Sequence, residues 1–97
     1  DGMVSAIGVK NLKTEDMKYI AVAGVFVAIG MKPVSDFVKG FVDMDSFGYI
    51  IAGEEGITSK EGIFVAGDVR TKNLRQVITA VSDGANAVAS LERYLRS

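Results

Sequence analysis

The last third of the chain changes its hydrophobic period, and this change limits the fold more than any other feature. Apolar residues recur at helical spacing over six turns, namely at Leu74, Val77, Ile78, Val81, Ala85, Val88, Leu91 and Leu95. Directly before them, the apolar run 63–66 predicts a buried strand that ends at Gly67-Asp68. We therefore predict an α/β fold with a helix from about Leu74 to Leu95, Asn73 as its N-cap, and the apolar stripe packed in the core.

The first thirty residues follow the strand period instead. Residues 3–12 and 18–22 predict two strands, and the polar stretch 13–16 between them has the length of a hairpin turn. The run 25–29 is apolar without alternation, which is typical of a strand covered on both faces. We predict a three-stranded antiparallel β-meander that ends before Pro33, because proline has no N–H to donate to a sheet.

The middle of the chain is rich in turns. Residues 34–39 predict a single helical turn that Gly40 ends, and residues 41–42 and 49–51 predict two short strands. No internal repeat and no low-complexity tract interrupts the chain. The sequence thus predicts short strands between the meander and the final strand and helix.

The chain holds more apolar residues than its own interior needs. Apolar residues and glycine, without tyrosine, make up about 57% of the 97 residues, where an ordinary domain has roughly 45–50%. A domain of this size also buries only about 60–65% of its surface. Either the chain is part of a larger protein, or it self-associates. The first residue is Asp1 rather than Met, which favours a fragment.

Composition excludes several classes of function. The chain has no Cys, His or Trp, so it can form no disulfide, thiolate or imidazole metal site, or His-dependent triad. A net charge of −1 gives no basic field for nucleic acid, and no apolar run is long enough to span a membrane. We expect a cytoplasmic protein without a metal site. A hydrolase or metal binder built on carboxylates is disfavoured, because no calcium-loop spacing occurs around Asp43, Asp45, Glu54 and Glu55.

The turn after the predicted final strand offers the best candidate chemistry. Asp68 falls at the carboxyl end of that strand, where ligands bind in open α/β sheets. An ionised carboxylate only accepts hydrogen bonds, so it suits the hydroxyls of a ribose or ribityl chain and repels phosphate. The helix start near Leu74, Arg75 and Gln76 favours negative charge through its free N–H groups and its dipole. The two features together would suit a flavin.

Plainer interpretations stand beside this one. Asp68 also fits an ordinary turn or helix-capping residue, and Arg70, Lys72 and Arg75 also fit a solvated basic loop. The glycine spacing contains no G-x-G-x-x-G fingerprint and no P-loop. A nucleotide bound here would therefore be held without its usual phosphate cradle.

Four stretches of the chain carry a resemblance to a known family. They are GVFVAIGMKP at 24–33, TSKEGIFVAGDVR at 58–70, LRQV at 74–77 and DGA at 83–85. In this order they resemble low-molecular-weight thioredoxin reductases, members of the pyridine nucleotide-disulfide oxidoreductase family. The later stretches are similar to the second flavin-binding segment of these enzymes. The resemblance extends over essentially the whole chain and is looser over residues 1–22.

The resemblance implies roles for five residues. The family's Gly-Asp pair, matched by Gly67 and Asp68, holds the ribityl chain of the flavin through its carboxylate. The family's triplet at the helix start, matched by Arg75, Gln76 and Val77, lies against the flavin ring. The implied cofactor is FAD, with NADPH as its reductant.

The resemblance also implies a division of the chain and a set of partners. Residues 1–31 match the end of the NADPH domain, and residues 32–97 match the C-terminal part of the FAD domain, where Gly84 lets the final helix approach a neighbour closely. The implied partners are the remainder of the flavoprotein, a second subunit and a thioredoxin-like disulfide. The family's FAD and NADPH fingerprints and its Cys-x-x-Cys are absent here. We therefore expect no catalytic residue in the chain and no activity from the chain alone.

Two other functions stay open. The chain could be a folded, non-catalytic interaction fragment that self-associates through strands at 25–29 and 63–66, because unpaired strand edges invite pairing. It is also similar to the same segment of related flavoproteins, such as ferredoxin–NADP reductases of the thioredoxin-reductase type.

Overall fold

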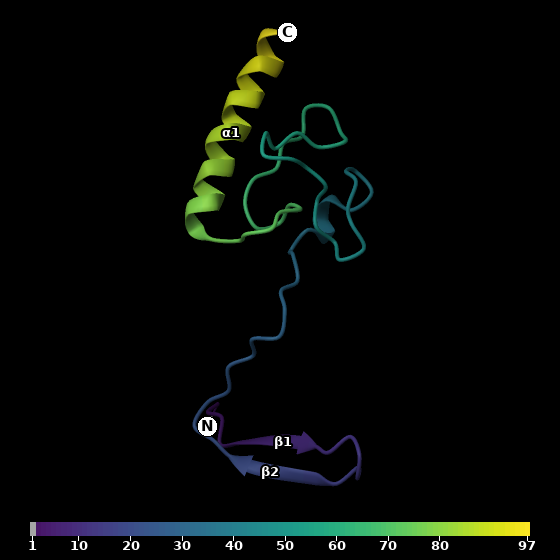
Figure 1. Cartoon of the computed structure of the whole chain (residues 1–97), viewed down its shortest axis with the longest axis vertical. Helices are drawn as coiled ribbons and strands as arrows, with labels where there is room; N and C mark the ends of the chain where they lie inside the picture. The colour runs from purple at the N-terminus through teal and green to yellow at the C-terminus, as the bar shows by residue number, and fades with distance from the viewer. Residues whose placement is uncertain (1) are drawn as a thin grey trace. The chain divides into compact units, whose positions relative to one another are not determined.

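The chain divides into two compact units in the computed structural model, which describes residues 2–97 (Figure 1). One unit ends at Gly30 and the other spans Met31–Ser97. This division lies one residue from the boundary expected from the sequence. The assignment of each part to a domain of the family stays a prediction.

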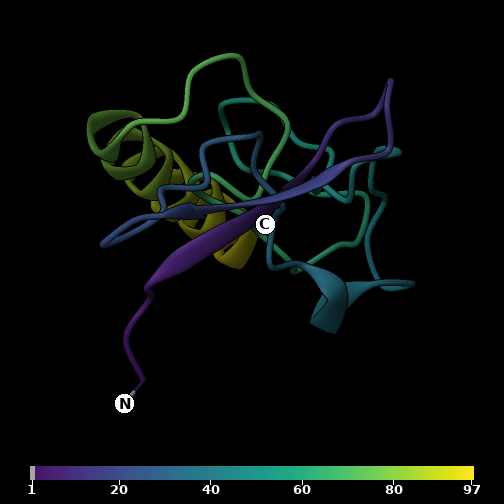
Figure 2. The ribbon, with the colours of Figure 1, turned by 90° about the horizontal axis from the view of Figure 1, so that it is seen from below.

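The first unit is built on a two-stranded antiparallel hairpin. β1 (Ala6–Lys10) pairs with β2 (Met17–Ala21), with Gly8 opposite Tyr19, and the strands run side by side in both views (Figure 2). Asn11 begins the turn, where its Oδ1 accepts hydrogen bonds from two backbone N–H groups at 2.9 and 3.2 Å. The predicted hairpin is confirmed, although its first strand is shorter than the sequence pattern suggests and its second begins one residue earlier.

The predicted third strand is wrong. Residues 25–29 join no sheet within the described part of the chain, and the side chain of Phe26 is 100% exposed. A strand needs a neighbour for its backbone hydrogen bonds, and the hairpin supplies none to this segment. The first unit is therefore a hairpin followed by an irregular apolar segment, and not a meander.

The second unit begins with irregular structure. η1 (Asp36–Val38) is a short 3-10 helix that falls within the predicted helical turn. Gly40 follows with a φ of +85°, a conformation that favours glycine, so it ends the helical turn as expected.

The predicted short strands at 41–42 and 49–51 are reduced to isolated bridges. Val42 pairs with Lys39, and Ile50 pairs with Met44 and with Arg70, while Phe64 in the run 63–66 pairs with Ile57. The run 63–66 is therefore not the buried strand that the sequence predicts. A strand buried in a sheet needs paired neighbours along its length, and the described residues offer this run only one bridge.

A small core lies under these loops. It is formed by four buried apolar side chains, Val42, Ile50, Ala52 and Val65. Partly buried side chains surround them, namely Val38, Met44, Ile63 and Val69. Irregular segments, and not a sheet, thus carry the core of the second unit.

The long helix α1 (Val77–Arg96) begins three residues later than predicted. Its N-cap is Gln76 and not Asn73, because Gln76 and Thr79 form a reciprocal capping box. In this box the Gln76 N–H donates to Thr79 Oγ1 at 3.1 Å. Residues 74–76 therefore lie before the helix.

The buried side of α1 is not its apolar stripe. Asp83 and Ser90 are the buried residues of the helix, and Ala80 and Ala87 lie close to glycines of the loops. The stripe that the sequence places in the core is exposed, with Val77 at 83%. The prediction that this stripe packs in the core is thus wrong within this chain. The expected close approach at Gly84 is also absent, because an added Cβ there would meet no atom within 4 Å among the described residues.

Candidate functional site

The Gly67-Asp68 turn is fixed by its backbone. Gly67 is buried with a φ of +87°, which an L side chain rarely adopts. Its carbonyl accepts a hydrogen bond from the Arg70 N–H at 3.3 Å, which closes a four-residue turn. The sequence signal at this position thus marks a real turn with a conformational need for glycine.

An open hollow of about 540 Å³ lies beside this turn. It is lined by Asp68, Arg75, Gln76, Val77, Ala80 and Val81. Four of the five residues predicted for a cofactor site therefore line one hollow, and the fifth, Gly67, forms the turn next to it.

The carboxylate of Asp68 is left without a full set of partners. Its Oδ1 is buried and accepts no hydrogen bond from any described residue. Buried polar atoms nearly always have a partner, and a carboxylate oxygen only accepts. The Oδ1 atom is therefore an unsatisfied acceptor, which a hydroxyl group or a water molecule can satisfy.

Arg75 does not supply that donor. Its Nε donates to the Asp68 carbonyl at 3.1 Å, and its Nη2 donates to the Arg70 carbonyl at 3.2 Å. Its guanidinium carbon also lies 3.8 Å from the centroid of the Tyr49 ring, which is a cation–π contact. Arg75 thus holds the backbone of the turn and is not part of a solvated basic loop.

The start of α1 forms the other side of the hollow. Gln76 and Val77 stand at the N-terminal end of the helix, where first-turn N–H groups lack helical partners and the dipole is positive. Such an end attracts negative charge. The hollow therefore combines an acceptor at Asp68 with an electropositive helix end.

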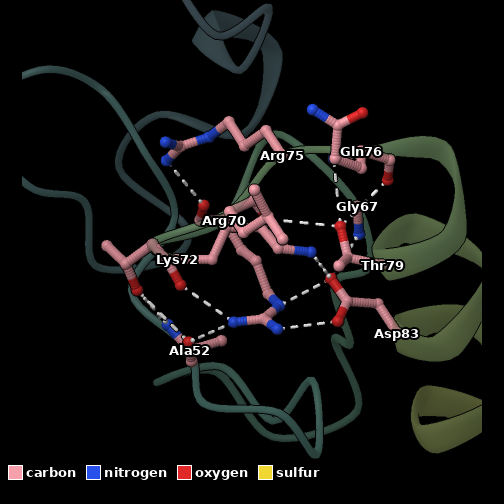
Figure 3. Close-up of polar contacts among 10 residues, drawn as sticks. Ala52, Gly67, Arg70, Lys72, Arg75, Gln76, Thr79 and Asp83 are labelled. Carbon is pink, nitrogen blue, oxygen red and sulfur yellow. Dashed lines mark hydrogen bonds and ion pairs between the residues drawn. The ribbon is translucent and has the colours of Figure 1, made fainter.

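A buried ion cluster lies behind the turn (Figure 3). Asp83 Oδ1 accepts from Arg70 Nη2 at 2.7 Å, and Asp83 Oδ2 accepts from Arg70 Nε at 2.7 Å and Lys72 Nζ at 2.8 Å. The same Oδ2 accepts from the Gly67 N–H at 2.9 Å. Arg70 and Asp83 are only 5% and 4% exposed. Short, charge-assisted bonds of this kind are among the strongest in proteins.

The cluster perturbs the ionisation of its members. The hydrogen bonds from Arg70 hold the pKa of Asp83 far below its ordinary value, with help from Lys72 and the Gly67 N–H and against the effect of burial. The hydrogen bonds to Asp83 in turn raise the pKa of Arg70. Asp83 is therefore a permanent anion at neutral pH.

Sequence reasoning missed this cluster. Arg70 and Lys72 also fitted a solvated loop, yet both side chains are buried against Asp83. One signal was available in the sequence. Asp83 lies three residues after Ala80 and seven before Ser90, so the three residues share one face of the helix. An acid on a face of small residues indicates a buried partner, because an unpaired buried charge is costly.

The other candidate acids do not gather into a site. Asp45 Oδ1 accepts two backbone N–H groups of its own turn, and Glu55 forms an exposed ion pair with Arg93 at 3.1 Å. Within residues 2–97 no three Asp or Glu side chains lie in a group that could hold a metal ion. None of the helices described is long and apolar enough to cross a membrane.

Comparison with known proteins agrees on one family. The sequence pattern of the pyridine nucleotide-disulphide oxidoreductases matches residues 2–84. A thioredoxin reductase of Peptoclostridium acidaminophilum is 45% identical over 100% of this chain and 33% of its own length. A thioredoxin reductase of Treponema pallidum is 46% identical over 95% of this chain and 30% of its own length.

Solved structures give the same result. The crystal structure of Lactococcus lactis thioredoxin reductase matches 95% of this chain and 30% of its own chain with a TM-score of 0.79 and 37% identity. The crystal structure of Streptococcus pyogenes thioredoxin reductase matches 97% of this chain and 31% of its own chain, with a TM-score of 0.70 and 45% identity. The chain thus spans about a third of the length of these relatives. It belongs to the pyridine nucleotide-disulphide oxidoreductase family, as a segment of the thioredoxin-reductase type.

Proposed function

We infer that this chain is the C-terminal part of a thioredoxin-reductase-like flavoenzyme and that it supplies one wall of the FAD site. The wall consists of the Gly67-Asp68 turn and the helix start at Arg75, Gln76 and Val77. The observation that carries the proposal is the buried, unpartnered Oδ1 of Asp68 beside a hollow lined by those residues.

The donor set of the hollow fits this cofactor. The ribityl chain of FAD carries hydroxyl groups, and a hydroxyl is the neutral donor that the Asp68 carboxylate lacks. A phosphate at the same point would be repelled by the carboxylate, so the pyrophosphate has to lie elsewhere. The residues present thus fit the polyol part of the cofactor.

The helix start suits the ring of the flavin. A reduced flavin carries negative charge near N1 and the C2 oxygen, and the positive end of α1 stabilises such charge. Val77 adds an exposed apolar surface against which a ring can lie. Arg75 stiffens the turn through the Asp68 carbonyl, so the carboxylate keeps its place.

The activity belongs to the complete protein. FAD, when bound, supplies the two-electron chemistry that links NADPH to a disulfide. This chain binds and orients, and no residue in it acts as a catalytic group. A thioredoxin-like disulfide substrate, a second subunit and a cytoplasmic setting remain predictions that come from the family resemblance.

The test is the FAD content of the full-length protein after gel filtration. Asp68→Ala removes the acceptor, and we expect it to weaken FAD binding by about tenfold or more, since a hydrogen bond to a charged group is worth about 1.5–3 kcal/mol. The control is Asp43→Ala, another acid with an exposed side chain, which should keep a full complement of FAD. Unchanged FAD content in Asp68→Ala would refute the role of Asp68.

A second function has its own supporting observation. The exposed apolar side chains of residues 25–29 and of the α1 stripe favour self-association of the 97-residue chain as a non-catalytic fragment. Light scattering after size exclusion decides this, since a stable monomer at tens of micromolar protein would argue against it. An FAD titration of the same sample shows whether the half-site binds without the rest of the protein.

A further inference from the structure

The position of the Asp68 carboxylate depends on four backbone anchors. Within the turn, the Arg70 N–H donates to the Gly67 carbonyl. Arg75 holds the carbonyls of Asp68 and Arg70. The fourth anchor is the bond from the Gly67 N–H to Asp83 Oδ2 at 2.9 Å. Of these four backbone anchors, only the last reaches helix α1, where the Arg70 side chain also binds Asp83.

Asp83 makes this anchor rigid because its carboxylate is itself held. Arg70 donates a hydrogen bond to each carboxylate oxygen at 2.7 Å, and Lys72 Nζ donates a third, also charged, at 2.8 Å. The far side of the Arg70 guanidinium donates to the carbonyls of Ala52 and Thr71. The Gly67 N–H therefore binds an atom that a network on two loop segments and one helix keeps in place.

The same pairing leaves the Asp68 carboxylate free. Arg70 and Lys72 are engaged with Asp83, and the guanidinium of Arg75 lies over the Tyr49 ring and on backbone carbonyls. These three nearest basic residues in the sequence thus make no ion pair with Asp68 in the described structure. Its buried Oδ1 accepts no hydrogen bond from any described residue.

We propose that Asp83 is a positioning residue of the flavin site, which fixes the Gly67-Asp68 turn so that the Asp68 carboxylate meets the ribityl chain. This inference rests on the proposed function of Asp68 and adds to it a residue that does not touch the cofactor. Asp83 acts through the position of the turn. A substitution of Asp83 should therefore no longer affect FAD binding once Asp68 cannot accept a hydrogen bond from the cofactor.

The experiment is a double-mutant cycle in the full-length flavoprotein. The variants are Asp68→Asn, Asp83→Asn and the pair together, and the readouts are the FAD dissociation constant and the visible circular dichroism of the bound flavin. We expect Asp83→Asn to raise the FAD dissociation constant about tenfold and to change the visible circular dichroism of the bound flavin. The double variant should bind FAD no more weakly than Asp68→Asn alone, because both act on one contact.

Three further variants separate positioning from plain destabilisation. Val42→Ala lowers stability through the core and should leave the FAD constant and the dichroism unchanged at a temperature where the protein is folded. Glu55→Gln breaks the exposed ion pair with Arg93 and should change nothing. Asp83→Glu keeps the charge but moves the carboxylate by one methylene, so it serves if Asp83→Asn does not fold, and it should also weaken FAD.

The outcomes distinguish the two proposals. If neither Asp68→Asn nor Asp83→Asn affects FAD, the proposed function of the turn is wrong. If Asp68→Asn weakens FAD while folded Asp83→Asn or Asp83→Glu binds like wild type, the site stands and the positioning role is overturned. Additive losses in the double variant would also overturn it, since Asp83 would then act by another route.

Discussion

Helix α1 has one face of small and polar residues that is buried and another face of large apolar residues that is exposed. The first carries Ala80, Asp83, Ala87 and Ser90, and the second carries the stripe that begins at Val77. Small side chains let the loops come close, as at Gly56, where an added Cβ would lie 3.1 Å from the Ala87 Cβ. The buried face thus makes specific contacts, whereas the large apolar side chains of the helix lie on the exposed face.

The difference shows that a hydrophobic stripe and a packed face are separate properties. A hydrophobic stripe shows which side chains would be stabilised by burial, but it does not show which segment or molecule buries them. In this unit the ion pair at Asp83, and not the stripe, joins the helix to the loops. Substitutions on the two faces should therefore differ in their effect on the free energy of unfolding.

Removal of the Asp83 carboxylate should have the largest effect. Asp83→Ala leaves the cations of Arg70 and Lys72 buried without an anion, and breaking a buried pair in this way costs about 3–5 kcal/mol. Urea unfolding of the 97-residue chain, followed by helical circular dichroism, measures the loss. A loss below 1 kcal/mol would mean that the cluster does not hold the helix.

The close approach at Gly56 should come next. Gly56→Ala places a Cβ 2.5 Å from the Val65 carbonyl oxygen at a φ of +67°, so we expect a loss of about 2 kcal/mol or more in the same assay. Gly84→Ala is the matched control on the helix itself, since its Cβ meets open space. That variant should gain up to about 1 kcal/mol from helix propensity. Equal changes in the free energy of unfolding for the two substitutions would mean that the buried and exposed faces of the helix do not differ in how tightly they pack.

Acid should weaken the buried face in a defined direction. The hydrogen bonds from Arg70 depress the pKa of Asp83 in the folded state, so the stability that Asp83 contributes is present above its unfolded pKa near 3.8. This contribution is lost as the pH falls below that value towards the folded pKa. Unfolding measured between pH 6 and pH 3 should therefore show a steeper loss for wild type than for Asp83→Asn. Parallel curves would contradict the assignment.

The exposed face should tolerate change best. Val88→Ser should alter the free energy of unfolding of the 97-residue chain by no more than about 0.5 kcal/mol, because Val88 is exposed and the two residues have similar helix propensity. The reverse exchange on the buried face, Ser90→Val, forces a larger side chain into a packed position and should cost about 1–3 kcal/mol. A large loss in Val88→Ser would show that the stripe already has a partner in solution.

Sequence reasoning found what depends on local pattern. The polar turn after β1, the long helix and the Asp68 turn each follow from neighbouring residues, and the residues at 75–77 meet Asp68 across one hollow. The failures have a common cause. The run 25–29 and the run 63–66 have the composition of buried strands, yet pairing depends on neighbours that this chain does not place beside them. Arg70 and Asp83 are 13 residues apart, and no local rule joins a loop cation to a helix acid.

The anchor from Asp83 to the Gly67 N–H also limits where the chain can change in length. Each residue added to a helix rotates everything beyond it by about 100° and shifts it by about 1.5 Å. One insertion between the N-cap Gln76 and Asp83 would turn the carboxylate away from the loops and release Gly67. Insertions at the exposed Asn73, or beyond Ser90, leave that geometry intact. Homologous chains should therefore vary in length on either side of the segment 76–83 and hardly at all within it.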